Sequence, residues 1–286
     1  MKDKKKLYII ICIVSFAIVL ASLTAIGVLL LSYKQSREDY SQLASQAWVG
    51  APSDGGKIFW QKPETQTPEN PANPEAPEIY DPVDIPVDFD FLLEQNQDII
   101  GWIQVEGTTV DYPILYDTTL DLFYLTHNFK GTKTPNGSIV VLGENSGDFT
   151  DFITVIYGHN MLDRSMFSTL HRFRNEDFFN NHGQIVIYTP ERRLIYQVFA
   201  VYRRNDRSIL GTYDLSTPEL RQGYLNGVFA QEDMAFFNLD YPVTESDRII
   251  TLSTCVGHPN YRYLVQAVLV SDEPGVYNGP ESTDKD

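Results

Sequence analysis

Cysteine is scarce in this 286-residue chain, which contains only Cys12 and Cys255. Cys12 lies inside a long apolar run near the N-terminus, so Cys255 has no partner for an intramolecular disulfide in the rest of the chain. Small secreted domains usually depend on disulfides. Their lack excludes a disulfide-stapled scaffold, and a folded part of roughly 200 residues can build an adequate core without them.

Positive charge is also in short supply. The chain has 22 Lys and Arg against 38 Asp and Glu, and the residues after Lys34 carry 17 basic and 37 acidic side chains. An excess of negative charge on this scale argues against nucleic acid or anionic lipid as a partner of the folded part. It fits a soluble domain that is exposed outside a membrane.

A long hydrophobic run is present at the N-terminus. Leu7–Leu31 forms 25 positions without a charge, which is long enough to span a bilayer of about 30 Å. Four lysines stand in residues 1–6, so the positive-inside rule places that flank in the cytoplasm and the chain after Tyr33 outside. A cleaved signal peptide is the alternative, but the run exceeds its usual length of about 7–15 residues and no A-x-A-like site follows closely. We therefore expect a single-pass protein of the cell membrane.

Residues 32–87 predict a stalk and a linker instead of a core. Gln35–Ala47 has helical character and would extend the anchor. From Gly50 to Pro86 the chain holds half of its 16 prolines and few apolar residues. Such a composition is typical of a semi-extended spacer. We expect it to hold the folded unit away from the membrane.

The folded domain is predicted to cover residues 88–271, and its fold class is mostly β. Short strand-like segments dominate, at 102–105, 108–116, 137–142, 152–158, 184–189, 194–202, 248–254 and 261–270. Helices are few: one begins at Asp88 or Asp90 as N-cap, and two more are expected over 164–174 and 217–237. A closed or nearly closed β-barrel with inserted helices is the natural architecture. The polar tail 272–286 is expected to be disordered.

Two local signals refine this pattern. Pro113 should lie at an edge or a bulge of its strand, because proline has no N–H to donate. The sequence PERR between two strand-like segments indicates a β-hairpin.

Cys255 closes the strand-like run RIITLSTC. A lone thiol at a strand end has two interpretations. The more frequent one is a small buried apolar filler. The other is a nucleophile, which attacks only as thiolate and needs a basic or cationic neighbour.

One of the five histidines stands out as that neighbour. His159 follows an apolar strand and Gly158 in VIYGHN, so it can project from a barrel rim. His258 is its rival, three residues after Cys255, but catalytic His and Cys are usually adjacent in space only. The other three have plainer roles on a surface, in a turn or in a pocket wall: His171, His182 and His127.

Arg262 is the candidate for stabilising a developing oxyanion, which acyl transfer requires. It begins the strand that follows the Cys255 loop. If the last two strands pair antiparallel, it lies across from Cys255. Its guanidinium stays charged and can donate two hydrogen bonds at once. From position alone, a solvated edge charge is the alternative.

Together these residues resemble a known family. TLSTC, followed by a strand carrying an arginine and preceded by YGHN, is similar to the sortases, the membrane-anchored cysteine transpeptidases of Gram-positive bacteria. The segments DIIGWIQVEGTTVDYPIL and VIYGHNMLDRSMFSTLHRF and the helix near 217–237 resemble class B. The resemblance covers 88–270. It implies a closed eight-stranded barrel with N-terminal helices and an inserted helix.

The resemblance also implies roles for residues. Cys255 would be the nucleophile, His159 the general acid/base, and Arg262 the ligand of the oxyanion and the substrate backbone. The substrate groove would include Ser253, Thr254, Asn128 and Leu162. Such an enzyme cleaves a C-terminal sorting motif of a secreted protein, keeps the acyl part as a thioester, and transfers it to an amine of peptidoglycan or a pilin. It needs neither a metal nor an organic cofactor.

Two features depart from the class. Val256 follows the cysteine where class B relatives often carry an acidic residue, and only VGHPNY separates Cys255 from Arg262. Three alternatives to wall anchoring stay open at this stage: a pilin-polymerising sortase, a cysteine endopeptidase with water as acceptor, and a non-catalytic surface-binding domain with a buried cysteine.

Overall fold

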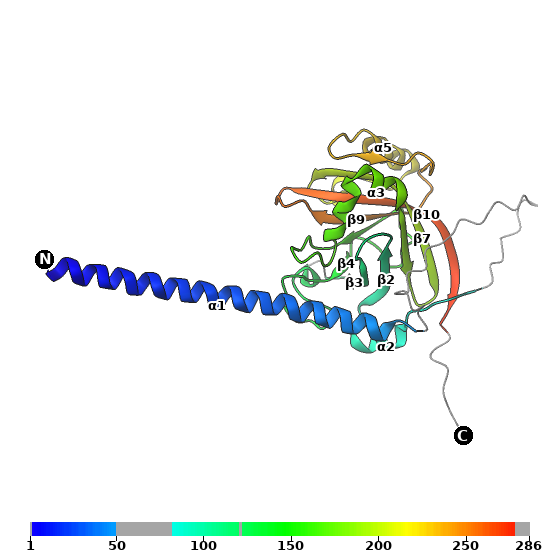
Figure 1. The fold of residues 1–286 in the computed structure, drawn as a ribbon. Coiled ribbons are helices and arrows are strands. Elements are labelled where there is room, and N and C mark those ends of the chain that lie inside the picture. The colour runs from blue at the N-terminus through cyan, green and yellow to red at the C-terminus, as the bar shows by residue number, and fades with distance from the viewer. Residues whose placement is uncertain (1, 50–81, 120–121, 278–286) are drawn as a thin grey trace, which may run out of the picture.

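The computed structural model describes residues 2–49, 82–119 and 122–277. Within these residues, eight strands form a closed barrel (Figure 1). They are β2 (Ile99–Val105), β3 (Asp111–Asp117), β4 (Ile139–Leu142), β5 (Ile153–Tyr157), β6 (Gln184–Tyr188), β7 (Arg192–Asn205), β9 (Ile249–Cys255) and β10 (Tyr261–Val276). The predicted fold class is confirmed.

The strand order explains how the barrel closes. The sheet runs β10–β9–β5–β4–β3–β2–β6–β7, and β7 pairs back onto β10 in antiparallel register. Two short strands, β1 (Val83–Asp84) and β8 (Phe236–Phe237), pair with β10 and β7. The main hydrophobic core contains fully buried side chains such as Trp102 and Tyr188. Because closure pairs the strand edges with one another, the eight described barrel strands leave no long edge for other chains.

The two local signals are both visible in the strand pairing. Pro113 precedes Ile114, the first residue of β3 that pairs with β4, so at Pro113 the strand has only β2 as a neighbour. The missing N–H is tolerated at such a locally unpaired position. The segment PERR contains the turn after β6 and the first two residues of β7, and the two strands pair antiparallel as the hairpin signal predicts.

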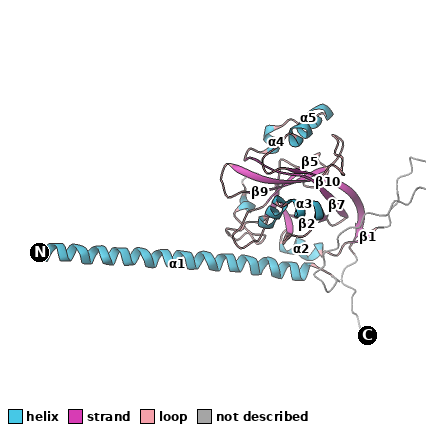
Figure 2. Cartoon of the chain, turned by 45° about the horizontal axis from the view of Figure 1, so that its top comes forward, coloured by secondary structure: helices cyan, strands magenta, loops and turns pink. Residues whose placement is uncertain are grey.

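Helices lie outside the barrel (Figure 2). The helices are α2 (Phe89–Gln95), η1 (Phe123–Leu125), η2 (Ser168–Arg174), α3 (Glu176–Asn181), α4 (Ile209–Thr212) and α5 (Pro218–Phe229), with η marking 3₁₀ helices. Asp88 is the N-cap of α2, and its carboxylate accepts from the Phe91 N–H at 2.8 Å. A second apolar cluster packs α5 against the barrel through Leu225, Val228 and Phe199.

Two predicted helices are shorter than expected. The one predicted over 164–174 begins only at Ser168, because Arg164 and Met166 have positive φ, which a right-handed helix cannot contain. The one predicted over 217–237 ends at Phe229. There the chain turns back to the barrel, where Asp233 pairs with Arg203 and β8 joins β7.

The first helix, α1 (Lys2–Ala47), includes the whole apolar run and is long and apolar enough to cross a membrane. Its last turns are part of the folded body, which corrects the prediction of a separate stalk. Tyr40, Leu43 and Ala47 are buried in the main core. The Tyr40 hydroxyl donates to the Gly137 carbonyl at 2.9 Å. A tyrosine and a leucine on one helix face provide the apolar area that fixes this end of α1 to the barrel.

The residues on either side of the proline-rich linker lie next to each other. Residues 50–81 lie outside the described residues, but the residues that flank them meet. The Val49 N–H donates to the Pro86 carbonyl at 2.9 Å, and the Asp88 N–H donates to the Ala47 carbonyl at 2.7 Å. These two hydrogen bonds join the end of α1 directly to the residues that begin the folded domain.

The predicted boundary at residue 271 is also too early. β10 continues to Val276 and pairs there with β1. Asp272 and Glu273, which make the tail look polar, form ion pairs instead: Asp272 with Arg192 and Arg248, and Glu273 with Arg193. Paired acidic side chains on the strand are compatible with sheet structure, although their composition resembles that of a disordered tail. Residues 278–286 lie outside the described part of the chain.

Removing the Asp272 carboxylate is expected to lower the free energy of unfolding by about 1–2 kcal/mol at neutral pH. Burial raises the pKa of Asp272, but hydrogen bonds and charge from Arg192 and Arg248 outweigh it and bring the pKa below its usual value. A carboxylate with a lowered pKa stabilises the fold above the usual aspartate range and loses that effect as the pH falls through its folded pKa. Urea unfolding should therefore separate Asp272→Asn from the native protein at pH 7, and the difference should shrink at an acidic pH below the usual aspartate range.

The matched control for this comparison is Glu232→Gln, which neutralises an exposed carboxylate near β8. It should leave the midpoint unchanged at both pH values. An equal loss in the two variants would mean that net charge, and not the ion pairs of Asp272, is responsible.

Candidate active site

Two neighbouring parallel strands bring His159 and Cys255 to the same end of the barrel. β5 and β9 are in register from Ile153–Ile249 to Tyr157–Ser253. His159 and Cys255 each stand two residues beyond that last pair. Parallel strands leave a sheet in the same direction, so the two side chains emerge side by side. The Gly158 N–H donates to the Ser253 carbonyl at 3.1 Å, which extends the pairing toward the site.

Position 158 has no room for a side chain, so it requires glycine. A Cβ added there would lie 2.6 Å from the ring of Phe167 and 2.6 Å from a side-chain carbon of Ile139. Such a contact is far inside van der Waals distance. The glycine before His159 therefore lets the strand end pack closely against the loop that follows.

Arg262 lies directly opposite Cys255. β10 pairs with β9 antiparallel, and the register partners are Arg262 and Cys255. Residues that face each other across antiparallel strands project to the same side, about 5 Å apart at Cβ. One end of the guanidinium is held in place, because Nη1 donates to the Pro259 carbonyl at 2.9 Å and to the Tyr261 carbonyl at 3.1 Å. The placement of Arg262 predicted from the sequence is confirmed.

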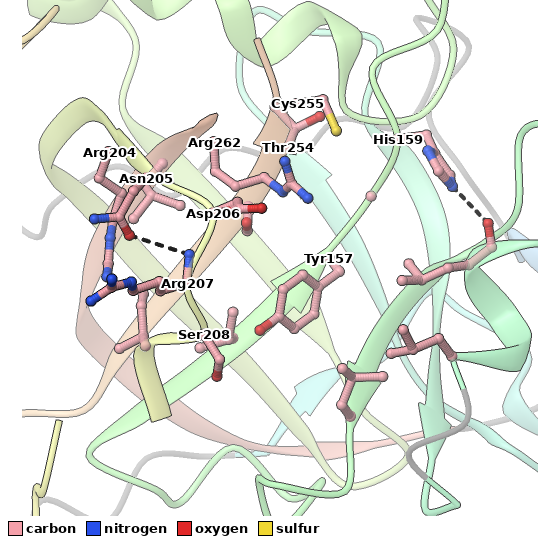
Figure 3. Close-up of a pocket in the computed structure, with 18 of the residues that line it drawn as sticks. Tyr157, His159, Arg204, Asn205, Asp206, Arg207, Ser208, Thr254, Cys255 and Arg262 are labelled. Carbon is pink, nitrogen blue, oxygen red and sulfur yellow. Dashed lines mark hydrogen bonds between the residues drawn. The ribbon is translucent and has the colours of Figure 1, made fainter. Parts of the chain in front are cut away.

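The three side chains line one cavity of about 380 Å³. The Cys255 thiol is free and partly exposed. In Figure 3 the Cys255 sulfur lies near the Arg262 guanidinium, and His159 stands on the other side of the sulfur. A buried filler would be enclosed by the core, so the interpretation of Cys255 as a filler does not fit this position.

A carbonyl group fixes the tautomer of His159. Its Nε2 lies 2.6 Å from the carbonyl oxygen of Leu125, at the end of η1 (Figure 3). A carbonyl oxygen can only accept, so Nε2 carries the hydrogen. In the neutral ring, Nδ1 is then the nitrogen that can take up a proton.

Known proteins are similar to this chain in both sequence and fold. The family model described as the sortase domain matches residues 103–270. Sortase B of Listeria monocytogenes is 35% identical over 184 residues, which cover 63% of this chain and 73% of the relative. Sortase B of Staphylococcus aureus is 31% identical over 167 residues, or 58% and 67% of the two chains.

A solved structure agrees with the sequence matches. The X-ray structure of Clostridium perfringens sortase B superimposes with a TM-score of 0.59 and 33% identity, covering 64% of this chain and 100% of that one. The chain belongs to the sortase family, in class B. It is accordingly a cysteine transpeptidase.

The remaining residues predicted for the groove of this sortase divide into two groups. Ser253 and Thr254 border the cavity, although Thr254 is buried and pairs in register with Tyr263. Asn128 and Leu162 are not brought to it. The Asn128 side chain is buried, and its amide oxygen accepts from backbone N–H groups of the following turn. Leu162 is 100% exposed in the loop after His159.

The other histidines of the sortase occupy different places. His258 is exposed in the loop between β9 and β10 and does not line the cavity. His127 stacks on Phe123, and His182 stacks on Phe178. His171, predicted to be a surface residue, is half-buried and its ring bonds to the Cys255 backbone. That expectation is wrong, because η2 lies against β10 instead of facing solvent along its length.

Sequence reasoning missed the second wall of the cavity. It is formed at the end of β7 and the start of α4 by Arg204, Asn205, Asp206, Arg207 and Ser208. Figure 3 shows these residues on the side of the cavity away from His159. Arg204 is the register partner of Arg262 on the other side of β10. The polar run RRNDRS directly after an apolar strand was a signal that could have identified this wall.

Proposed function

We propose that Cys255, His159 and Arg262 carry out the transpeptidase reaction of this sortase. The observation that carries the proposal is the pairing at the strand ends. Arg262 stands opposite Cys255 in register, His159 leaves the neighbouring parallel strand at the matching position, and all three line one cavity. A nucleophile, a proton carrier and an oxyanion ligand are the minimum set for acyl transfer through a thioester.

The first half-reaction forms the thioester. His159 takes the thiol proton at Nδ1, and the sulfur of Cys255 attacks the carbonyl carbon of the scissile peptide bond. Negative charge develops on the carbonyl oxygen and is stabilised by the guanidinium of Arg262, which two backbone carbonyls already hold in place. The C–N bond then breaks, and His159 gives its proton to the departing amine.

The second half-reaction reverses the roles. An acceptor amine loses a proton to His159, and its nitrogen attacks the thioester carbonyl. The C–S bond breaks, Cys255 leaves as thiolate and recovers the proton, and a new amide bond has formed. The donor is a secreted protein with a C-terminal sorting motif, and the acceptor is an amine of peptidoglycan.

The membrane helix supports the cellular setting of this reaction. α1 would cross the membrane once, with its lysine-rich start in the cytoplasm and the barrel outside. Secreted proteins and the cell wall meet on that side. The negative charge of the exposed domain keeps it from adhering to anionic lipid.

The acceptor is tested with the full-length protein in detergent micelles. A peptide library identifies a cleaved sequence, and that peptide is then incubated with purified peptidoglycan stem peptides or with Nα-acetyl-lysine amide. We expect mass spectrometry to find the acyl fragment joined to the stem peptide, with a free acid as the minor product.

Other reaction products would change the acceptor that is assigned to the enzyme. Transfer to the lysine derivative alone would indicate a pilin-polymerising enzyme. Free acid as the sole product at every amine concentration would indicate an endopeptidase that uses water. The absence of any cleaved peptide, together with an unreactive thiol, would contradict the proposal as a whole.

A further inference from the structure

Two side chains outside the proposed catalytic set converge on the backbone of the nucleophile. The Asn160 side-chain amide donates to the Cys255 carbonyl at 3.0 Å. Nε2 of His171 lies 2.9 Å from the same oxygen. One carbonyl has two lone pairs, so both acceptor positions of this oxygen are used.

The hydrogen bond from the Asn160 side chain continues the β5–β9 ladder beyond the last hydrogen bond between the two backbones. In a parallel pair, every second residue repeats the same hydrogen bond. The Gly158 N–H donates to the Ser253 carbonyl, so a regular ladder would next join the Asn160 N–H to the Cys255 carbonyl. The amide of the Asn160 side chain makes that bond instead. The backbone at His159 is thereby free to leave the sheet, while Cys255 keeps its partner.

Two contacts join the start and the end of the loop that carries Asn160. Asn160 forms a bridge with Met166, and the Phe167 N–H donates to the His159 carbonyl at 3.0 Å. The chain then enters η2, which contains His171. One short segment therefore provides His159 to the cavity and two donors to the backbone behind Cys255.

His171 is suited to act as a fixed donor. The carbonyl oxygen can only accept, so Nε2 of His171 carries the hydrogen. Burial and the charge of Arg174 lower the pKa of His171, although the bond to Cys255 opposes them. The ring also packs against Tyr263, with 5.2 Å between the ring centroids. A neutral ring held by packing keeps its N–H directed at one point.

We propose that Asn160 and His171 are positioning residues that fix the direction of the Cys255 thiol. The direction of the Cys255 carbonyl fixes the ψ angle of that residue. The strand pairing fixes the backbone on its N-terminal side. Together the two constraints determine where the side chain of Cys255 points. The two donors thus hold the sulfur between His159 and the guanidinium of Arg262. The inference rests on the proposed role of Cys255 as nucleophile.

The first test is Asn160→Ala in the full-length protein. With the peptide selected from the library by the native enzyme, kcat should fall about ten-fold or more, while KM stays within about two-fold. The residue is exposed, so the thermal midpoint should not change. Asn181→Ala is the matched control: it removes another exposed asparagine amide that donates to a backbone carbonyl, that of Asp177, and should not affect kcat.

Two outcomes would overturn the inference. One is an unchanged kcat in Asn160→Ala. The other is a rise in KM that accounts for the whole loss, since a residue that binds the substrate would behave so. Cys255→Ala in the same assay separates this failure from that of the proposed function. If Cys255→Ala still cleaves, the nucleophile is wrong; if it is inactive while Asn160→Ala is fully active, only the positioning role is wrong.

His171 provides an independent test. His171→Leu removes the donor and should also lower kcat about ten-fold. His171→Gln keeps an N–H donor of similar reach and should recover most of the lost rate. Equal losses in both variants would show that the packing on Tyr263, and not the hydrogen bond, is what matters. Circular dichroism and the iodoacetamide alkylation of Cys255 verify that each variant is folded with its thiol intact.

Discussion

Replacing Cys255 with alanine is expected to abolish both peptide cleavage and transfer to an amine, with a fall in rate of about 10³-fold or more. The sulfur is the atom that bonds to the acyl group, and neither His159 nor Arg262 can take its place. The fold should persist, because the side chain is small and partly exposed at the end of β9. The thermal midpoint should stay within about 2 °C. Cleavage rate and thermal unfolding are measured on the same preparation.

The chain offers a matched control in its other cysteine. Cys12 is exposed in the apolar part of α1. Cys12→Ala should cleave at the native rate, and iodoacetamide should still inactivate it by alkylating Cys255. If Cys255→Ala continued to cleave the selected peptide, the thioester mechanism would have to be abandoned.

The arrangement around Cys255 could be predicted in part from the sequence. An apolar run that ends in cysteine, followed after a short loop by another apolar run, indicates two adjacent antiparallel strands. Their pairing alone brings Arg262 opposite Cys255, and the register confirms it. Local patterns are sufficient here because the two strands are consecutive in the barrel and the loop between them is short.

The surroundings of His159 could not be predicted without the fold. β5 and β9 are parallel neighbours, but many residues separate them in the chain. Periodicity shows that each segment is a strand and not which strands are adjacent. The same limit applies to the Leu125 carbonyl that fixes the tautomer of His159, since η1 reaches the site from another part of the barrel. The apolar strand and the glycine before His159 favoured it over His258, but they did not show which strand it would lie beside.

Composition is misleading at both ends of the domain. Few apolar residues between Gly50 and Pro86 predict a linker, but composition does not show where the two ends of a segment lie. Two contacts show where these ends lie: Tyr40 is buried in the main core, and Trp48 forms a bridge with Val87. At the other end, the charges of Asp272 and Glu273 suggested a tail, although each has an arginine partner on an adjacent strand or loop. Pairing across strands cannot be derived from local charge.

The second large effect is expected from His159→Ala, which should lower kcat by about 10²–10⁴-fold. Two steps depend on this ring: it takes the proton from the thiol, and it gives a proton to the departing amine. An unprotonated amide nitrogen is a very poor leaving group. The loss should therefore be smaller when the scissile amide is replaced by an ester, whose oxygen leaves with less help from an acid. Steady-state rates on matched amide and ester peptides measure the difference.

The comparison that decides the acid/base assignment is His258→Ala. His258 is near Cys255 in sequence, but its ring is exposed in the loop and its Nδ1 accepts from the Asn260 N–H at 3.3 Å. It contributes nothing to the cavity wall, so its removal should change kcat less than about two-fold on either substrate. A severe loss in His258→Ala with a mild one in His159→Ala would move the proton carrier to the loop between β9 and β10. An equal loss of His159→Ala on amide and ester would mean that the ring acts on the thiol alone, and another group would have to protonate the leaving amine.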